Sequence, residues 1–586
     1  MNIQTITLQY DGKTITLPIN KTQFFDELYV DVYTKIERGG TRLSISLHPK
    51  KPLILSDLRV VFSINAPQNS NVFCNGWQSW TESREFALTE RIQPLSFLAR
   101  PFLSAMGDYS FYKYPQQKGK LHSWSYTYLR SSAHKSKNTI ALTASLNENL
   151  CFTVFEWDDA AQTLTARKDL NNLMLEHSFP LLDLWYAEGE EQQLFDTFFQ
   201  LNDTKPCIAP APINGWTSWY YHYTKINERV IKDNLAAFAE QKNNTFLPAD
   251  NSNTHPSVFQ IDDGWQTAVG DWLSVKPDSF PDGMASIADD IRSRNMTPGL
   301  WLAPFICANN SLIFKTKKDW LLTDDGGKPV VAGYNPLWSG WFYALDLYNM
   351  EVQGYLRQVL QVMQYKWGFS LLKLDFLYAA CLYPPKNKTR GQVMHEAMDF
   401  LRSIIGTPNQ ILACGVPLAA AFGRADYCRI GADVHSGWEH SFLRFINGRE
   451  RVSTVLSLQN TIGRRHLDGR AFRNDPDVAV LRSENTKLTI TQKNTLFIIN
   501  TLLGSVVFIS DNTDNYIDNT KSQFGMMEFA QQRTVQKVVT DKDYCEINFT
   551  VQNKKYTAFC NLSANKRTTF SGKRSIVLQP HESIIV

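Results

Sequence analysis

Two opposite charges within a short apolar run are the first candidates for chemistry. In the stretch FSLLKLDFLY, Lys373 and Asp375 lie two residues apart and would share one face of a β-strand, with apolar side chains on the other face. A buried strand accepts charged side chains only where they are paired or used. The stretch alone leaves two interpretations open, a structural ion pair or part of a functional site.

Two further stretches end in the same way. YCRIGADV would place Arg429 and Asp433 on one strand face, and VFQIDDGW would end on Asp262 and Asp263 beside a tryptophan. Several strands that end in charged residues are typical of the C-terminal rim of a (β/α)8 barrel, where the active site of such barrels lies. This pattern favours a site over a structural ion pair.

The elements around these residues alternate between strands and helices, which indicates βαβ units and a parallel sheet. Helices are predicted at Glu228–Gln241 and Val352–Trp367. Eight strands are predicted, at Ile213–Trp219, Val258–Asp262, Gly299–Pro304, Leu371–Asp375, Ile411–Gly415, Tyr427–Gly431, near Asp468–Arg473 and at Ser505–Ser510. Eight strands over roughly 300 residues match a (β/α)8 (TIM) barrel.

The connection from Phe305 to Leu371 is too long for a simple loop between a strand and a helix. It carries Trp320, Trp338 and Trp341, and we expect part of it to shape the rim of a pocket.

Short alternating strands flank this region on both sides. Thr41–Leu47 and His122–Tyr128 alternate cleanly, which favours an N-terminal β-sandwich, and the proline-containing stretch from Asp203 to Pro212 suggests a linker. Short strands return near the C-terminus, at Tyr544–Phe549, Tyr556–Phe559, Ser575–Leu578 and Ser583–Val586. We therefore predict a multidomain protein: a β-sandwich over residues 1–205, a barrel over 206–519 and a small antiparallel β domain over 520–586.

Composition excludes several partners. The chain has 586 residues with 43% hydrophobic and 20% charged residues, as expected of a globular protein with sizeable cores. A net charge of only +3 gives no reason to expect nucleic acid or an anionic membrane as a partner. The 15 Trp and 23 Tyr could stack on sugar rings, although packing in a β-rich protein explains most of them.

The cysteines and the N-terminus favour a cytoplasmic setting. The nine cysteines are scattered without a CxxC pair, so neither a disulfide framework nor a zinc site is expected. The first residues lack the basic and apolar segments of a signal peptide. The longest charge-free apolar stretch, Thr495–Ser510, is shorter than the ~18 residues of a membrane span, and it is predicted as the end of a barrel helix followed by a strand.

Four motifs carry a resemblance that covers nearly the whole chain. NGWQSW, FQIDDGW, LLKLDFLYA and RIGADV follow one another in the order of the α-galactosidase (melibiase) group of glycoside hydrolase family 36, which the chain resembles from about Asn75 to its C-terminal β region. The resemblance implies a retaining exo-glycosidase without a cofactor. Such an enzyme removes terminal α-D-galactosyl residues from substrates of the melibiose and raffinose type through a covalent galactosyl-enzyme intermediate.

The two roles that such chemistry needs can be assigned to two aspartates. One carboxyl must be ionised to attack C1, and the other must hold a proton for the leaving oxygen. Asp375 suits the first role because Lys373 on the same strand face would help to keep it ionised. Asp433 suits the second role because a nearby negative Asp375 would raise its proton affinity. The resemblance implies the same roles, Asp375 as nucleophile and Asp433 as general acid/base.

The resemblance also implies the sugar-binding residues. Asp262 and Asp263 would bind O4 and O6 and thereby select the axial O4 of galactose, while Lys373 would donate to O3 or O4. Cys414 and Arg429 would lie near the 2-hydroxyl. Two adjacent carboxylates such as Asp262 and Asp263 are also ligands for Mg²⁺ or Ca²⁺, but no cluster of further oxygen ligands follows them, so no metal is expected.

Aromatic residues complete the predicted pocket. The resemblance implies that Trp301 in GLWLAP and Trp219 in GWTSWYY line it, together with a tryptophan of NGWQSW. For this last position we choose Trp80, with Trp77 as the competing choice, and ordinary core packing of this turn stays an equal alternative.

Three other functions remain open. A galactosyl transferase of the raffinose or stachyose synthase type would keep the fold and the chemistry. An α-N-acetylgalactosaminidase would need space for an acetamido group where Arg429 and Cys414 are expected. A non-catalytic sugar-binding protein belongs to a different class, and the presence of both carboxylates argues against it.

Overall fold

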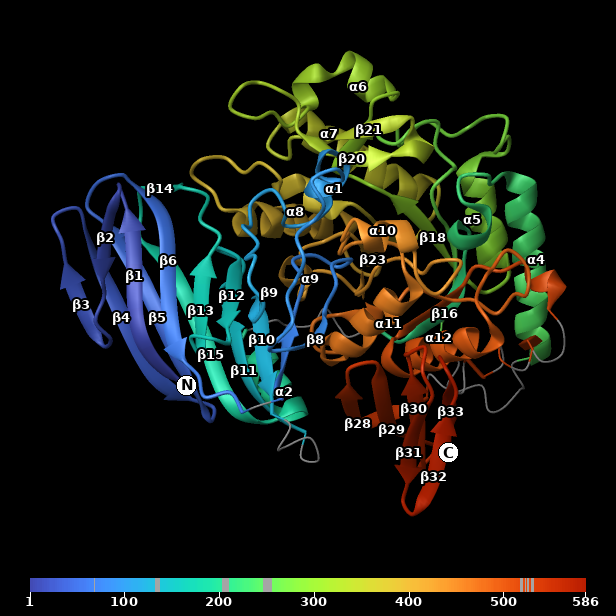
Figure 1. Cartoon of the computed structure of the whole chain (residues 1–586). Helices are drawn as coiled ribbons and strands as arrows, with labels where there is room; N and C mark the ends of the chain where they lie inside the picture. Colours follow the sequence, from blue (N-terminus) through green and yellow to red (C-terminus); the bar gives the residue numbers. More distant parts are fainter. Residues whose placement is uncertain are drawn as a thin grey trace.

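The computed structural model describes residues 1–67, 69–131, 138–202, 210–245, 256–516, 520–521, 523, 526–527 and 532–586. Figure 1 shows a β-rich N-terminal part, a central part that mixes helices and strands, and a small β part that contains the C-terminus. The predicted boundary between residues 205 and 206 lies outside the described residues, and the one between 519 and 520 adjoins them. Both boundaries therefore stay predictions.

The N-terminal part consists of two antiparallel sheets whose buried side chains belong to one hydrophobic core. The seven-stranded sheet contains β1 (Asn2–Tyr10), β2 (Lys13–Thr16), β6 (Leu53–Ser63), β9 (Lys120–Trp124), β12 (Thr153–Asp158), β13 (Thr163–Lys168) and β14 (Leu173–Leu175). The eight-stranded sheet contains β3 (Lys21–Phe24), β4 (Leu28–Glu37), β5 (Gly40–Pro49), β7 (Asn71–Cys74), β8 (Arg84–Ala87), β10 (Tyr126–Arg130), β11 (Thr139–Ser145) and β15 (Phe179–Glu190).

The prediction of one strand over His122–Tyr128 is wrong, whereas Thr41–Leu47 lies within β5 as expected. Ser125 has a φ of 67° and separates β9 from β10, which belong to different sheets. A left-handed residue between two alternating runs leaves the period-2 pattern unchanged, so the sequence pattern could not reveal the break.

The central part contains a curled sheet in which every pair of neighbouring strands is parallel. Its order is β25 (Arg473–Asp475), β24 (Tyr427–Arg429), β23 (Gln410–Ala413), β22 (Leu371–Leu374), β18 (Thr297–Leu302), β17 (Ser257–Ile261), β16 (Ile213–Thr217), β27 (Val506–Ile509) and β26 (Val478–Ala479). Only Pro476 and Asp477 separate β25 from β26 along the chain, so the two edges of the sheet meet. This arrangement is consistent with a (β/α)8 barrel.

The eight predicted strands are present with bounds shifted by one or more residues, and two of the shifts bear on the site. The seventh begins at Arg473 rather than near Asp468, and it is broken because Pro476 lacks an N–H group and Asp477 has a φ of 83°. The sixth ends at Arg429, so Asp433 lies in the following loop and not on the strand face that the alternation suggested.

Helices surround the parallel sheet (Figure 1). The longer ones are α4 (Glu228–Thr245), α5 (Gly283–Ser293), α7 (Met350–Gln361), α8 (Arg390–Ile405), α11 (Thr454–Gly463) and α12 (Ile490–Leu503). Both predicted helices are present, although the second changes to a π-helix over Val362–Lys366. The long connection after β18 forms a small sheet of β19 (Ile306–Ala308), β21 (Gly340–Ala344) and β20 (Val331–Asn335), which lies beside α1 (Arg100–Leu103).

The C-terminal part is an antiparallel sheet with one added hairpin. The sheet runs in the order β28 (Thr534–Asp541), β29 (Tyr544–Val551), β30 (Lys554–Asn561) and β33 (Ser583–Ile585), and the hairpin joins β31 (Arg567–Ser571) to β32 (Arg574–Leu578). Its buried face shares a core with α12 through side chains such as Ile499, Leu503 and Ile547. The sequence did not predict β28 or β31.

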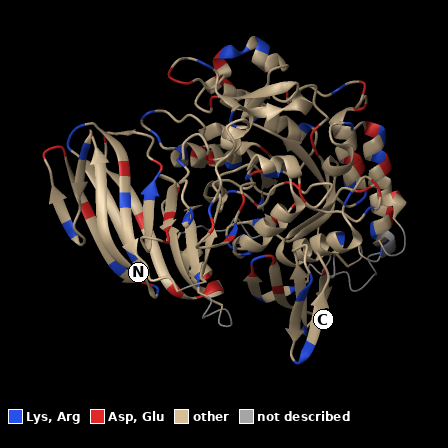
Figure 2. Cartoon of the chain, in the orientation of Figure 1, with Lys and Arg blue, Asp and Glu red and all other residues tan. Residues whose placement is uncertain are grey.

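The surface carries both signs of charge. Figure 2 shows Lys and Arg positions interleaved with Asp and Glu positions along the N-terminal strands and the outer helices. In the described part of the chain, no helix has the length and apolar character that crossing a membrane requires.

Candidate active site

A cavity of about 490 Å³ lies at the carboxyl ends of the parallel strands. Eight of the residues predicted for the site line it: Trp80, Trp219, Asp262, Asp263, Trp301, Lys373, Asp375 and Asp433. The other two, Cys414 and Arg429, do not line the cavity but contact residues that do. The structure thus brings together residues from five strand ends and from the N-terminal part.

Asp375 follows the last residue of β22 and is buried in the cavity wall, with 7% of its surface exposed. Its Oδ2 accepts from Trp301 Nε1 at 3.0 Å and its Oδ1 from the backbone N–H of Phe376 at 2.8 Å. Burial raises the pKa of Asp375, although Lys373 and the bond from Trp301 lower it. The expected influence of Lys373 is therefore present, but desolvation outweighs it.

The direct partner of Lys373 is Asp262 rather than Asp375. Lys373 Nζ donates to Asp262 Oδ2 at 2.8 Å, and Gln260 Nε2 donates to the same oxygen at 2.9 Å. Burial alone would lower the pKa of Lys373, but the attraction of Asp262 raises it overall. The two buried charges therefore compensate each other, which is what a charged strand end in a core requires.

Asp263 is held by two donors that do not come from a neighbouring strand. Trp338 Nε1 donates to its Oδ2 at 2.7 Å, and Gln266 Nε2 donates to its Oδ1 at 2.6 Å. Burial nevertheless raises the pKa of Asp263 to about 6. Trp338 belongs to the long connection after β18, so the expectation that this connection shapes the pocket rim is confirmed.

Trp320 and Trp341, the other two tryptophans named above for that connection, lie outside the cavity lining. Trp320 donates from Nε1 to Glu351 at 2.9 Å, and Trp341 stacks on Phe102 with ring centroids 5.4 Å apart.

Asp433 is the more accessible of the two candidate catalytic carboxylates, with 35% of its side chain exposed. Arg429 Nη1 donates to its Oδ1 at 2.8 Å. The same guanidinium also contacts Asp475 at 3.2 Å and Asp477 at 2.7 Å. Arg429 therefore joins three carboxylates at the ends of β24 and β25.

Sequence reasoning missed Asp475, Asp477 and Tyr220. Asp477 Oδ2 accepts from the backbone N–H of Val434 at 2.7 Å and from the hydroxyl of Tyr220. Burial raises the pKa of Asp477 to about 7, with Arg429 opposing and the charge of Asp433 adding to the rise. The run RNDPDV did offer a signal, because it places two carboxylates at the end of a barrel strand.

Glu450 is a further carboxyl group in the cavity lining that the sequence did not suggest. Its Oε1 accepts from Thr81 Oγ1 at 2.7 Å and its Oε2 from the hydroxyl of Tyr109 at 2.6 Å. Burial raises the pKa of Glu450 to about 7. Both donors belong to the N-terminal part, so the hydrogen bonds of Glu450 connect residues that are far apart in the sequence.

The turn NGWQSW reaches the cavity through Trp80, whereas Trp77 packs against Phe111 with ring centroids 4.9 Å apart. Trp80 Nε1 donates to Cys414 Sγ at 3.2 Å. Gly415 permits this approach, because a Cβ there would lie 2.9 Å from the Trp80 ring. Of the two competing tryptophans, Trp80 is therefore the one at the cavity.

A buried arginine anchors this turn to the barrel. The guanidinium of Arg464, which follows α11, donates to the backbone carbonyl oxygens of Ser79 at 2.6 Å, Gln78 at 3.0 Å and Gly76 at 3.3 Å. These bonds fix the backbone beside Trp80 and explain how an N-terminal loop holds one position over the barrel mouth.

Within the described residues, no group of three or more His, Cys, Asp or Glu side chains is arranged to hold a metal ion. The cavity instead combines carboxylates, one lysine and indole N–H groups, which can bond several hydroxyl groups of a small polar molecule.

Known proteins resemble this chain in sequence and in fold. The family model described as "Melibiase" matches residues 201–398. Alpha-galactosidase Mel36A of Lactobacillus acidophilus is 23% identical over 181 residues, which are 30% of this chain and 21% of the relative. A type blood alpha-D-galactosamine galactosaminidase of Flavonifractor plautii is 26% identical over 27% of this chain and 16% of its own length. The matches thus span about a fifth of these curated relatives.

Solved structures match over more of the chain. The alpha-galactosidase TtGalA of Thermus thermophilus in complex with stachyose has a TM-score of 0.68 and 26% identity, and the match covers 89% of this chain and 99% of that one. Alpha-galactosidase AgaA of Geobacillus stearothermophilus, in complex with 1-deoxygalactonojirimycin, has a TM-score of 0.62 over 96% of this chain and 80% of its own, and at 14% identity it supports the fold alone. The resemblance inferred from the four motifs is confirmed.

Proposed function

We propose that this chain, whose residues 201–398 match the family model described as "Melibiase", is a retaining α-galactosidase that hydrolyses terminal α-D-galactosyl residues of galactosides and oligosaccharides. The observation that carries the proposal is the meeting of Asp375 and Asp433 in one cavity with the bonded pair Asp262 and Lys373. The complex of the T. thermophilus enzyme with stachyose supports the choice of substrate class.

Asp375 is the proposed nucleophile. Trp301, Cys414 and the backbone N–H of Phe376 bond its carboxylate, which is thereby oriented but keeps lone pairs for attack on C1. Burial disfavours its negative charge, as the raised pKa records. The positive charge that develops at C1 in the transition state relieves this cost, and bond formation then gives the covalent galactosyl-enzyme intermediate.

Asp433 is the proposed general acid/base. Its exposure suits a group that must reach the leaving oxygen first and an entering water afterwards. Burial and the charge of Asp433 raise the pKa of Asp477 to about 7 against the opposing charge of Arg429, so Asp477 can hold a proton near neutral pH. In the proposed mechanism Asp433 itself gives its proton to the departing glycosidic oxygen and takes one back from the entering water.

Asp262 and Asp263 are the proposed readers of O4 and O6, with Lys373 as the donor to O3 or O4. Arg429 and Cys414 are proposed to lie near the 2-hydroxyl. If the two aspartates bond the axial O4 of galactose, an α-glucoside leaves a buried carboxylate oxygen without a partner. Discrimination in kcat/KM should then reach about 10³ or more.

We also propose the three-part organisation described above, with the parallel sheet closed into a (β/α)8 barrel, and a cytoplasmic location. All cysteines in the described part of the chain are unpaired and buried, which supports a reducing compartment.

Hydrolysis of the p-nitrophenyl derivatives of α-galactose, α-glucose and α-N-acetylgalactosamine, measured in parallel, tests the proposal. We expect the galactoside to be preferred by about 10³ in kcat/KM. Comparable values for the glucoside would overturn the specificity assignment, and a preference for the N-acetylgalactosaminide would identify the alternative activity of the F. plautii relative. Product analysis with raffinose as acceptor separates hydrolysis from galactosyl transfer.

A further inference from the structure

A second cavity of about 410 Å³ lies at the opposite end of the parallel strands. Arg473 begins β25, Ser505 directly precedes β27 and Pro212 directly precedes β16, so the cavity lies at the amino ends of these strands. Its remaining wall comes from β28 of the C-terminal sheet and from α2 (Glu191–Leu201) of the N-terminal part. It shares no lining residue with the candidate active site.

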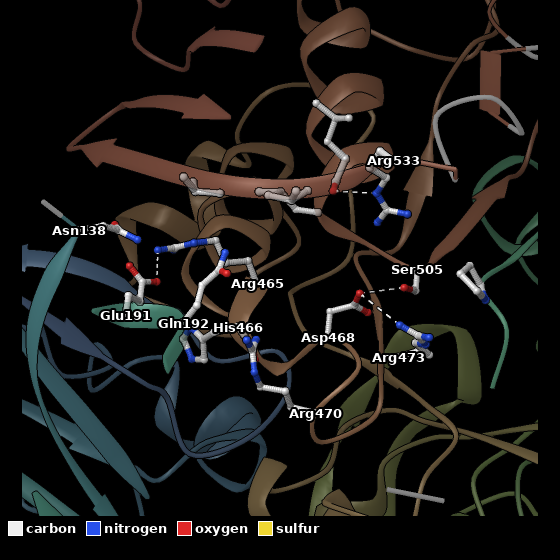
Figure 3. A pocket seen from close by; sticks show the side chains of 15 residues that line it. Asn138, Glu191, Gln192, Arg465, His466, Asp468, Arg470, Arg473, Ser505 and Arg533 are labelled. Atoms are coloured by element: carbon white, nitrogen blue, oxygen red, sulfur yellow. Dashed lines mark hydrogen bonds and ion pairs between the residues drawn. The ribbon is translucent and has the colours of Figure 1, made fainter. Parts of the chain in front are cut away.

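The charged side chains of this cavity are mostly cations. Four arginines line it, Arg465, Arg470, Arg473 and Arg533, against two carboxylates, Glu191 and Asp468 (Figure 3). Glu191 is already shared, because it pairs with Arg465 and also with Arg130, the latter at 2.6 Å. Arg470 pairs at 2.6 Å with Asp196, which does not line the cavity.

Arg533 has no carboxylate partner at ion-pair distance in the described part of the chain. Its Nε donates to the carbonyl oxygen of Leu502 at 3.0 Å, and its Nη2 donates to the carbonyl oxygen of Gly504 at the end of α12. Within the described residues its Nη1 makes no hydrogen bond, and Figure 3 shows the Arg533 and Arg473 side chains on the same side of the cavity. Burial lowers the pKa of Arg533, and the nearby charge of Arg473 lowers it further while Asp468 opposes.

Asp468 cannot compensate both of these arginines. Its Oδ2 lies 3.8 Å from Arg473 Nη1 and accepts from Ser505 Oγ at 2.9 Å. Its Oδ1 accepts from the backbone N–H of Asn474 at 2.8 Å. Two guanidinium groups therefore share a single carboxylate whose oxygens are already bonded, which leaves uncompensated positive charge at the cavity wall.

The ring of His466 also lines this cavity. Its Nε2 lies 2.9 Å from the hydroxyl of Tyr126, and the pKa of His466 is lowered well below its ordinary value. Burial is the largest cause, and the positive charges of Arg465 and Arg470 add to it. Burial and nearby arginines thus disfavour a further positive charge on His466.

We propose that this cavity binds a small molecule that carries a phosphate group, with the phosphate oxygens between Arg533 and Arg473. A guanidinium group bonds phosphate oxygens in a bidentate manner. Arg533 has no carboxylate at ion-pair distance within the described residues, and Arg473 has only Asp468, which lies 3.8 Å away and already accepts from Ser505. The volume of about 410 Å³ lies within the usual range for small-ligand sites and leaves room for a sugar-sized remainder. The ligand would then contact the barrel and the C-terminal sheet at once.

Isothermal titration calorimetry at constant ionic strength tests this site, with inorganic phosphate, glucose 6-phosphate and glucose as ligands, because glucose lacks the axial O4 that the candidate active site is proposed to bind. We expect saturable 1:1 binding of one or both phosphate compounds and none of the neutral hexose. Tighter binding of the hexose phosphate would identify an organic phosphate ester as the ligand, and equal binding would identify the phosphate group alone. The variant Arg533→Gln removes one charged donor, so the affinity for the phosphate compounds should fall by about 10- to 100-fold.

The control is Arg567→Gln. Arg567 also belongs to the C-terminal part and pairs with Asp541 at 2.6 Å, but neither residue lines the cavity. Arg473→Gln provides a second test if Arg533→Gln does not fold, as judged by circular dichroism. The proposal would be overturned if neither phosphate compound showed saturable binding. It would also be overturned if the wild type and the cavity variants bound the phosphate compounds with equal affinity. Hydrolysis of p-nitrophenyl α-galactoside should change by less than about twofold in all three variants, so this test is separate from that of the proposed function.

Discussion

The indole of Trp338 offers a sharp test of how the cavity controls Asp263. The change Trp338→Phe removes the N–H that donates to Asp263 Oδ2 at 2.7 Å and keeps an aromatic ring in place. A hydrogen bond to a charged group contributes about 1.5–3 kcal/mol, which corresponds to about a 10- to 100-fold change in an equilibrium. We therefore expect kcat/KM for p-nitrophenyl α-galactoside at neutral pH to fall by about 10- to 100-fold.

The same change should alter the pH dependence in a defined direction. The pKa of Asp263 is about 6, and the bond from Trp338 lowers it, so its loss must raise the pKa further. Since the ionised carboxylate is the form proposed to bind the sugar hydroxyls, the acid limb of the kcat/KM profile should move to higher pH in Trp338→Phe.

Trp320→Phe is the matched control. Trp320 belongs to the same connection and also donates its indole N–H to a carboxylate, Glu351, but it does not line the cavity. Its replacement should leave kcat/KM and the acid limb unchanged. An unchanged profile in Trp338→Phe, or an equal loss in Trp320→Phe, would refute the reasoning.

Two further predictions concern groups that the sequence did not reveal or assign. The pKa of Glu450 is about 7 in the folded protein, against an ordinary value of 4.5, so the folded state binds this proton more tightly than the unfolded state. Protonation of Glu450 therefore contributes to the free energy of unfolding below about pH 4.5, and this contribution is lost as the pH rises to about 7. The free energy of unfolding, measured with urea, should therefore fall less between pH 5 and pH 8 in Glu450→Gln than in the wild type. An unchanged pH dependence would show that this carboxyl group does not titrate in that range. Arg464→Met removes the bonds to the carbonyl oxygens of Ser79 and Gln78 that hold the Trp80 turn. KM for the galactoside should then rise by about tenfold or more, with an unchanged circular dichroism spectrum. An unchanged KM would show that the turn holds its position without Arg464.

Strand ends were the part of the site that the sequence predicted well. Lys373, Asp375, Asp262 and Asp263 follow or end apolar strands, and parallel strands place their carboxyl ends at one edge, so local patterns were sufficient to bring them together. The pairing of Lys373 with Asp262 was not predictable in this way. It depends on the order of the strands in the sheet, in which β22 and β17 lie on either side of β18.

Other features depend on contacts between distant segments. Asp433 reaches the cavity from a loop held by Arg429, although the alternation of residues suggested a longer strand. Glu450 is defined by donors more than 300 positions away, at Thr81 and Tyr109, and no local pattern records such a contact. The left-handed Ser125 likewise divides two strands without changing the pattern of polar and apolar residues.

The identity of the nucleophile and of the acid/base is the central claim, and azide rescue tests it most directly. Asp375→Ala and Asp433→Ala should each lower kcat on a disaccharide by several orders of magnitude, whereas Asp433→Ala should keep much more activity on an activated aryl galactoside that needs little proton assistance. With azide, Asp375→Ala should yield the inverted β-galactosyl azide and Asp433→Ala the retained α-galactosyl azide. The opposite assignment of the two anomers would contradict the roles given to these carboxylates.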